Sequence, residues 1–142
     1  MPRIGVIGAG SLGFHHIQIL RDMYSVRLAG FIESRDERAR EVESELGVRR
    51  YAGTEALLAD VDAVTIVVPT PAHYAVAKAA IEAGKHVFIE KPIAATLAEA
   101  EEILDLANAK GCLVQIGHVE RFNRAVRAAL PYVARPRFIA AL

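Results

Sequence analysis

Residues 8 to 13 read Gly-Ala-Gly-Ser-Leu-Gly, and they directly follow the apolar run Ile4-Gly5-Val6-Ile7. The segment after them has the apolar spacing of an amphipathic helix. A G-x-G-x-x-G motif at a strand-to-helix turn is typical of a dinucleotide-binding site. There, Gly8 permits the tight turn, Gly10 lets a pyrophosphate approach the backbone, and Gly13 lets the helix pack close to the strand. The N–H groups and the positive dipole end at the helix start then face the phosphates.

An acidic residue, Glu33, ends the next apolar run, 20 residues after Gly13. A carboxylate at this place can accept hydrogen bonds from both hydroxyls of an adenosine ribose and repel a 2′-phosphate, which favours NAD over NADP. We include the next residues, Ser34 and Arg35, in the predicted cofactor site. Arg35 can stack on adenine or receive a 2′-phosphate, so NADP stays an alternative. A solvated carboxylate at a helix start is the other interpretation of Glu33.

Apolar runs alternate with helical patterns along the chain, as in repeated βαβ units. Right-handed crossovers then predict an α/β Rossmann fold, a doubly wound parallel sheet in the strand order 3-2-1-4-5-6. Thr54 and Thr96 are predicted N-caps, and Glu99 completes a capping box with Thr96. The predicted strands are residues 3–8, 26–33, 63–68, 86–90 and 113–117, with a short, weaker one near 49–51. The predicted helices are residues 11–23, 35–46, 54–59, 72–83, 96–110 and 120–133.

The bulk composition narrows the class of protein. The 142 residues are 53% hydrophobic, which suits one domain with a sheet buried on both faces. A formal net charge of zero argues against a general nucleic-acid binder. No signal peptide is visible, and no apolar run approaches the ~20 residues of a membrane span, so no membrane association is expected. The single cysteine, Cys112, cannot form an internal disulfide, which favours a reducing cytoplasm.

The end of the chain reads Pro-Arg-Phe-Ile-Ala-Ala-Leu over residues 136–142, like the start of another strand. The dinucleotide fold is complete before this segment. We therefore expect a Rossmann domain over residues 1–135, with 136–142 as the start of a missing α+β domain for substrate binding and oligomerisation. A strand after Pro136 has no obvious partner, and such an apolar edge invites pairing with another chain, so a homo-oligomer is one expectation.

The strand predicted over 63–68 runs into Pro69-Thr70-Pro71-Ala72-His73. The two prolines fix an extended turn at the carboxyl edge of the sheet, where open α/β folds bind ligands. We therefore place Pro69 and Thr70 in the cofactor site, where the threonine could touch the nicotinamide ribose or the pyrophosphate. His73 follows in the first turn of the next helix and is also included; an exposed or capping histidine is the alternative.

The strand predicted over 86–90 ends in Glu90-Lys91-Pro92. Pro92 keeps Lys91 out of the helical conformation. A lysine at the carboxyl edge of the sheet can hydrogen-bond a substrate hydroxyl, so Lys91 is the candidate catalytic residue. The alternative is a plain turn.

Two histidines, His15 and His16, follow the glycine motif. Neighbouring side chains on a helix point about 100° apart, which makes these two a poor chelating pair. We predict no metal site.

Three motifs thus occur in order: G-A-G-S-L-G-F-H-H from residue 8, P-T-P-A-H from residue 69, and E-K-P from residue 90. With them, nearly the whole chain resembles the N-terminal domain of the Gfo/Idh/MocA family of NAD(P)-dependent sugar and polyol oxidoreductases. The resemblance implies that Ser11 and Leu12 join the three glycines at the pyrophosphate. It also implies that Glu90 contacts the nicotinamide ribose region, that Lys91 is the catalytic lysine, and that His16 packs or hydrogen-bonds near the phosphates.

Members of this family usually carry an Asp and a His early in a second domain, and the His takes the proton of the substrate hydroxyl. The sequence ends before that point. Hydride transfer needs a base and a closely held alcohol carbon, since a misplacement of ~1 Å can cost ~100-fold in rate. We therefore expect this chain to bind dinucleotide with little or no turnover by itself.

Residues 117–123, Gly-His-Val-Glu-Arg-Phe-Asn, resemble the sixth-strand end of family members that act on nucleotide-linked sugars such as UDP-N-acetylglucosamine. His118 and Arg121 are accordingly candidate substrate residues, since arginine forks suit a diphosphate. An exposed basic helix face is the alternative. The arginines predicted near one face of the last helix are Arg121, Arg124 and Arg127.

The leading hypothesis is the cofactor-binding part of an NAD(P)-dependent oxidoreductase that acts on a hydroxyl of a sugar, polyol or nucleotide sugar. One alternative is a non-catalytic nucleotide-binding or redox-sensing module. Another is a methyltransferase-like fold that binds S-adenosylmethionine, but the Pro-Thr-Pro and Glu-Lys-Pro motifs have no role there.

Overall fold

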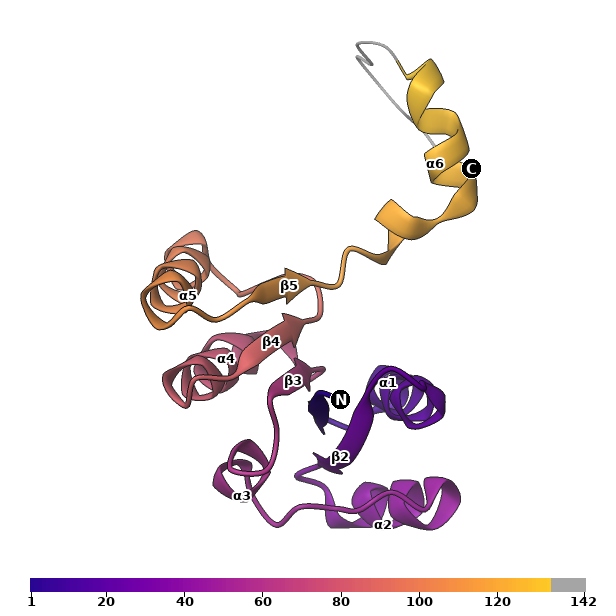
Figure 1. The fold of residues 1–142 in the computed structure, drawn as a ribbon, viewed down its shortest axis with the longest axis vertical. Coiled ribbons are helices and arrows are strands. Elements are labelled where there is room, and N and C mark those ends of the chain that lie inside the picture. The colour runs from indigo at the N-terminus through magenta and orange to yellow at the C-terminus, as the bar shows by residue number, and fades with distance from the viewer. Residues whose placement is uncertain (134–142) are drawn as a thin grey trace.

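The computed structural model describes residues 1–133, and its centre is one parallel sheet (Figure 1). The strands are β1 (Arg3–Ile7), β2 (Arg27–Ile32), β3 (Ala63–Ile66), β4 (His86–Ile89) and β5 (Val114–Ile116). They pair in the order β2-β1-β3-β4-β5. This is the predicted order with the third strand left out, so the Rossmann topology is confirmed.

The prediction of a short strand near 49–51 was wrong. It is a single parallel bridge between Phe31 and Arg50. The Phe31 N–H donates to the Arg49 carbonyl at 3.0 Å, and the Tyr51 N–H donates to the Phe31 carbonyl at 2.8 Å. The ladder stops there because Gly53 starts the next helix only two residues later.

Helices cover both faces of the sheet, as a doubly wound fold requires. Figure 1 shows α1 (Ser11–Asp22) and α2 (Asp36–Leu46) on one side, and α3 (Thr54–Leu58), α4 (His73–Glu82) and α5 (Leu97–Lys110) on the other. Successive strand residues point to opposite faces, so Val6 of β1 joins the core under α1 and α2 while Ile7 joins the larger core opposite.

Of the two threonines that the sequence predicts as N-caps, one caps its helix and the other does not. The Glu99 N–H donates to Thr96 Oγ1 at 3.2 Å and the Thr96 N–H donates to Glu99 Oε2 at 3.1 Å, which confirms the capping box. Thr54 is not a cap, and that prediction was wrong. The Leu57 N–H bonds to the carbonyl of Gly53, so the helix closes its first ring on Gly53 and Thr54 is already inside it.

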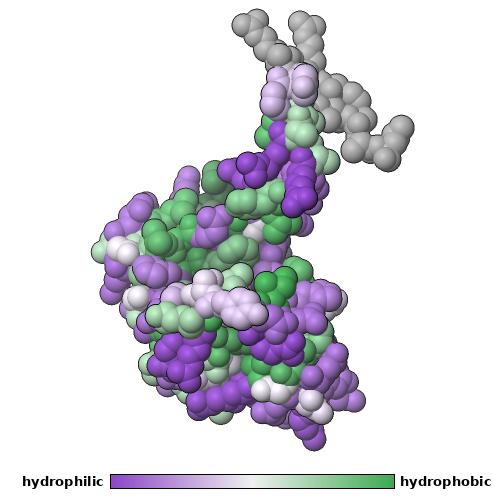
Figure 2. Space-filling model, turned by 45° about the vertical axis from the view of Figure 1, so that its right-hand side comes forward, coloured by the Kyte–Doolittle hydropathy of each residue, from purple (hydrophilic) through white to green (hydrophobic). Residues whose placement is uncertain are grey.

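The last part of the described chain forms an arm over residues 119–133. It consists of η2 (Val119–Phe122), α6 (Arg124–Ala129) and η3 (Leu130–Tyr132), so the continuous helix predicted over 120–133 was wrong. Asn123 has an extended backbone, and its Oδ1 accepts from the Ala125 N–H at 2.9 Å, so it ends one helical segment and caps the next. Figure 1 shows this arm leaving the end of β5, and Figure 2 shows it projecting from the body of the molecule.

Within residues 1–133, no helix is long and apolar enough to cross a membrane. The strand expected after Pro136, and the domain boundary at 135/136, lie outside the described residues.

Candidate functional site

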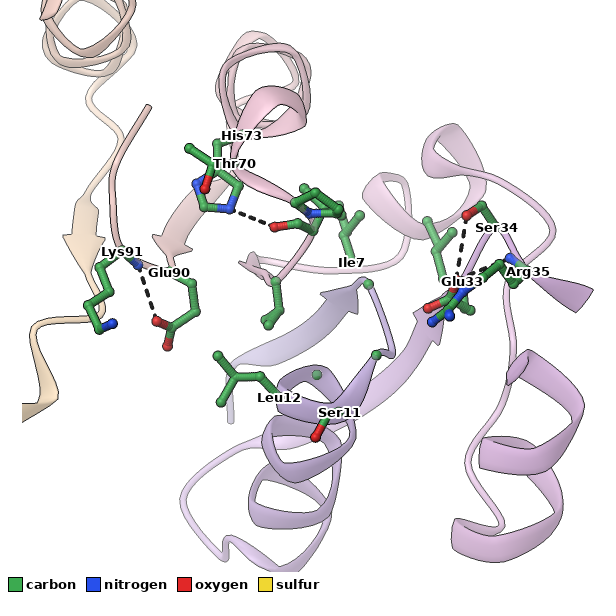
Figure 3. A pocket seen from close by; sticks show the side chains of 17 residues that line it. Ile7, Ser11, Leu12, Glu33, Ser34, Arg35, Thr70, His73, Glu90 and Lys91 are labelled. Atoms are coloured by element: carbon green, nitrogen blue, oxygen red, sulfur yellow. Dashed lines mark hydrogen bonds and ion pairs between the residues drawn. The ribbon is translucent and has the colours of Figure 1, made fainter. Parts of the chain in front are cut away.

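A cleft of about 730 Å³ opens at the carboxyl ends of β1, β2, β3 and β4 (Figure 3). Open α/β sheets bind ligands at this edge. The structure brings every residue of the predicted cofactor site to this one cleft. Those lining residues are Gly8, Gly10, Ser11, Leu12, Gly13, Glu33, Ser34, Arg35, Pro69, Thr70, His73, Glu90 and Lys91.

The glycine turn is packed tightly on one side and open on the other. Gly8 has φ +97°, and a Cβ there would collide with the carbonyl of Val67. A Cβ on Gly13 would collide with the carbonyl of Gly8. A Cβ on Gly10, by contrast, would have only the Arg35 guanidinium within reach, at 3.9 Å. The space beside Gly10 therefore belongs to the cleft, where a bound group can come close to the backbone.

The first turn of α1 faces this space. Its first helical hydrogen bond runs from the Phe14 N–H to the Gly10 carbonyl, so the amides of Ser11, Leu12 and Gly13 have no acceptor within the helix. The turn carries no acidic side chain, and Gly10 supplies no side-chain cap. This turn therefore fits the pyrophosphate of a dinucleotide.

Glu33 lies at the end of the cleft formed by β2. Its Oε2 accepts from the Ala9 N–H at 2.9 Å, and its Oε1 accepts from the backbone N–H and the Nε of Arg35, both at 3.1 Å. Burial opposes ionisation of Glu33, but the hydrogen bonds from Arg35 and Ala9 outweigh it and hold the pKa of this carboxyl below its usual value. The carboxylate is buried and fixed, while the Arg35 side chain is 66% exposed.

The turn after β3 lines the middle of the cleft. Pro69 precedes η1 (Thr70–Ala72), and α4 begins at His73. His73 is 1% exposed, so the alternative of an exposed histidine was wrong. Its Nδ1 lies 2.8 Å from the Pro92 carbonyl oxygen and its Nε2 lies 2.8 Å from the Val68 carbonyl oxygen. The ring therefore ties together the two loops that follow β3 and β4, and it has no nitrogen left for a ligand.

Glu90 and Lys91 follow β4 at the opposite end of the cleft from Glu33. The Glu90 Oε2 accepts from the backbone N–H of Lys91 at 3.1 Å (Figure 3), and its Oε1 lies 3.2 Å from His16 Nε2. Burial lowers the pKa of His16, while the charge and hydrogen bond of Glu90 oppose this shift. Within residues 1–133 no ion pair joins the Lys91 ammonium to the Glu90 carboxylate, and Lys91 is exposed to solvent.

The contact between His16 and Glu90 was missed from the sequence, which placed His16 near the phosphates. One signal was available. Position 16 is three residues after Gly13, which is buried against the sheet, so its side chain lies near the inner face of α1. Gly117 was also missed: a Cβ there would lie 2.7 Å from Glu90 Oε1, so the carboxylate needs a glycine at the end of β5.

The candidate substrate residues lie elsewhere. His118 lies between β5 and the arm, and Arg121 lies on the arm; both are exposed and neither lines the cleft. Arg121 belongs to η2, while Arg124 and Arg127 belong to α6, so the predicted single arginine face was wrong. The extended backbone of Asn123 separates the two segments. Among residues 1–133, no three His, Cys, Asp or Glu side chains cluster as a metal site would require.

Comparison with known proteins agrees with this geometry. A family model described as an oxidoreductase family with an NAD-binding Rossmann fold matches residues 2–118. The chain is 42% identical over 125 residues to the UDP-N-acetylglucosamine 3-dehydrogenase of Acidithiobacillus ferrooxidans, covering 88% of this chain and 39% of that protein. A solved structure of that enzyme has a TM-score of 0.84 at 40% identity, over 92% of this chain and 41% of the other.

Two further proteins widen the comparison. Inositol 2-dehydrogenase 1 of Saccharopolyspora erythraea is 39% identical over 127 residues, which cover 85% of this chain and 38% of that protein. A structure of a Synechocystis biliverdin reductase with biliverdin and NADP⁺ has a TM-score of 0.83 at 29% identity, over 94% of this chain and 44% of the other. The chain therefore spans about two fifths of the length of the relatives that it matches.

Proposed function

This chain belongs to the Gfo/Idh/MocA oxidoreductase family, as its N-terminal NAD(P)-binding domain, and we propose that it is the cofactor-binding part of a dehydrogenase. The proposed reaction is hydride transfer between a hydroxyl-bearing carbon of a sugar, polyol or nucleotide sugar and the cofactor. The observation that carries the proposal is one cleft with three parts in series. Glu33 lies at one end, the glycine turn at the middle, and Lys91 at the other end.

The residues of this chain would act mainly by binding and orienting. Backbone amides at the start of α1 would hold the pyrophosphate, and Glu33 would accept from the adenosine ribose. When bound, the nicotinamide supplies the hydride chemistry. Lys91, exposed beside the cleft, would donate a hydrogen bond to the substrate oxygen and stabilise negative charge there as the hydroxyl proton leaves.

We propose NAD as the cofactor, with NADP as the alternative. Thermal unfolding in the presence of NAD⁺, NADH, NADP⁺ or NADPH tests this first step. A ligand at 100 times its Kd stabilises a protein by ~2.7 kcal/mol, which shifts the Tm of a domain of this size by several degrees. The absence of a shift with all four dinucleotides would contradict the proposal.

A matched pair of variants makes the test specific to the cleft. Gly10 has φ −61°, which any residue adopts, and a Cβ there would enter only the cleft. Gly10→Ala should therefore fold normally and lose the shift with dinucleotide. Gly53→Ala is the control, because Gly53 is also extended and a Cβ there meets nothing within 4 Å. Equal dinucleotide binding by both variants would place the binding site elsewhere.

The substrate class is a proposal that rests on relatives that act on UDP-N-acetylglucosamine and inositol. We propose that the chain binds dinucleotide but turns over little or no sugar by itself, since it spans only about two fifths of the length of the dehydrogenases that it matches. Robust production of NADH from UDP-N-acetylglucosamine or myo-inositol by the 142-residue protein would contradict this. We also propose a cytoplasmic location, from the lone cysteine of the sequence, and no interaction with nucleic acid.

A further inference from the structure

The cleft carries two buried carboxylates, and their surroundings differ. Glu33 is hydrogen-bonded to the guanidinium of Arg35, so a positive charge lies directly on it. Within the described part of the chain, Glu90 has no lysine or arginine paired with it. Among residues 1–133, its single side-chain ion-pair contact is His16 Nε2 at 3.2 Å, and its carboxylate also accepts a hydrogen bond from the uncharged backbone N–H of Lys91.

At a pH above the pKa of His16, the His16 ring is uncharged and does not compensate the negative charge of Glu90. Burial lowers that pKa, although Glu90 opposes the shift, so the ring is neutral at pH 8 and donates a hydrogen bond without a charge. The Lys91 ammonium is exposed to solvent, where water and salt screen it. The Glu90 side chain is 9% exposed, and a buried charge is screened much less.

The Glu90 carboxylate is also held in one place from three elements. His16 contacts it from α1, the Lys91 N–H contacts it from the end of β4, and the Gly117 backbone limits it from the end of β5. Figure 3 shows the carboxylate directed into the cleft. A fixed charge of one sign in a cleft wall discriminates between ligands of different charge.

The two redox forms of the cofactor differ in charge at this end of the cleft. With the pyrophosphate at the glycine turn and the adenosine at Glu33, the nicotinamide lies toward β4 and Glu90. The oxidised nicotinamide ring carries one positive charge, and the reduced ring is neutral. The adenosine and pyrophosphate are the same in both forms. A negative charge near the ring therefore stabilises the oxidised form alone.

We propose that Glu90 makes this cleft bind NAD⁺ in preference to NADH, and that His16 is the positioning residue that holds the carboxylate there. This rests on the proposed function, since it requires a nicotinamide dinucleotide in the cleft. Unit charges roughly 10 Å apart at an effective dielectric constant of about 20 change a binding constant by about tenfold, which sets the expected selectivity.

The test compares the Kd of NAD⁺ and NADH by calorimetric titration at about pH 8 for the wild-type chain, Glu90→Gln and Glu33→Gln. We expect Glu90→Gln to weaken NAD⁺ about tenfold and NADH little, so that the preference disappears. Glu33→Gln should weaken both forms equally, because the adenosine is common to both. An unchanged ratio of the two Kd values in Glu90→Gln would overturn the inference.

The Glu33→Gln control separates the two proposals. If the wild type binds neither dinucleotide, or Glu33→Gln changes neither Kd, the proposed function fails. If both dinucleotides bind and only the effect of Glu90 is missing, the proposed function stands and this inference fails.

A second measurement does not depend on the folding of Glu90→Gln. Lowering the pH through the pKa of His16, which lies below the ordinary histidine value of 6.5, places a positive charge on the His16 ring beside Glu90. The wild-type preference for NAD⁺ should therefore decrease at acid pH. The ionisable neighbours among residues 1–133 are His15, which adjoins His16 on α1, Lys91, which adjoins Glu90 after β4, and His118, which adjoins Gly117 after β5. His16→Gln keeps a donor for Glu90 without a titrating ring, so it should keep the preference at about pH 5.5 as well as pH 8. A preference that falls equally in the wild type and His16→Gln would overturn the role of His16.

Discussion

Arg35 and Glu33 form one charged pair at the adenosine end of the cleft, and the arginine is the exposed partner. Its side chain is 66% exposed, while Glu33 is 7% exposed and also held by the Ala9 N–H. A ligand with a 2′-phosphate can therefore draw the guanidinium away without unfolding anything. Whether the cleft accepts NADP depends on this exchange.

We expect Arg35→Ala to lower the affinity for NADP⁺ about tenfold, because a charge-assisted hydrogen bond contributes ~1.5–3 kcal/mol. The affinity for NAD⁺ should change little, since Glu33 keeps its bond from Ala9. Calorimetric titration of both dinucleotides measures this. Arg40→Ala is the control, because Arg40 is exposed on α2, does not line the cleft, and within residues 1–133 its side chain donates only to the Asp36 carbonyl. Equal losses of NAD⁺ and NADP⁺ in Arg35→Ala would contradict the prediction.

The same pair predicts a pH dependence of stability. The pKa of Glu33 in the folded chain is below its ordinary value of 4.5, so the folded state binds fewer protons there than the unfolded state. The stability that Glu33 contributes is therefore complete above pH 4.5 and is lost as the pH falls through the lowered pKa. Urea unfolding at several pH values should show a steeper acid loss for the wild type than for Glu33→Gln. If the free energy of unfolding fell equally with pH in both proteins, Glu33 would not contribute to the loss of stability in acid.

Single residues show where the sequence was sufficient and where it was not. Glu33 and Lys91 could be assigned to the sheet edge, because a parallel strand that ends in a polar residue delivers it there. Their partners could not be assigned. His16 is far from Glu90 in the sequence, and only the packing of α1 against β4 brings them together. Arg35 is close to Glu33, but its rotamer decides whether it faces the carboxylate or the solvent.

At the scale of helices, the two threonines at helix starts give a direct comparison. Thr96 accepts from the Glu99 N–H, whereas Thr54 makes no cap bond. We expect Thr96→Ala to lower the free energy of unfolding by ~1 kcal/mol. Thr54→Ala should change it by less than ~0.5 kcal/mol. Thermal or urea unfolding of both variants measures the difference, and equal losses would contradict the cap assignment.

The elements also show which local signals mislead. Thr54 follows Gly53, and a glycine can itself be an N-cap. The preference of threonine for this position therefore placed the N-cap one residue after its actual place. The apolar spacing of residues 120–133 suits a helix, but Asn123 competes with its side chain for the Ala125 N–H and ends the first segment. At Arg50 the chain pairs with β2 through a single bridge. A strand needs several consecutive paired residues, and whether they form depends on the direction that the chain takes after the first pair.

At the scale of the molecule, the described chain consists of a doubly wound body that holds the whole cleft and an arm that adds nothing to its lining. The residues of the cleft come from the ends of β1 to β4, the turns after them and the first turns of α1 and α4. The arm follows β5 and Gly117, where a Cβ would collide with the Glu90 carboxylate. Changes to the outer part of the arm should therefore leave dinucleotide binding intact.

The arm carries large apolar side chains that do not pack on the body: Phe122 is 73% exposed and Leu130 is 58% exposed. Burying such side chains is worth about 1.5–3 kcal/mol each, so their loss matters only where they are buried. We expect Phe122→Ser with Leu130→Ser to leave the Tm and the Kd for NAD⁺ of the monomer unchanged. If the double variant is instead less stable than the wild type, sedimentation of both proteins shows where the arm is buried. If the double variant loses stability and the wild type sediments as a larger species, the arm is buried between copies of the chain. If it loses stability while both remain monomers, the arm packs on its own body in solution.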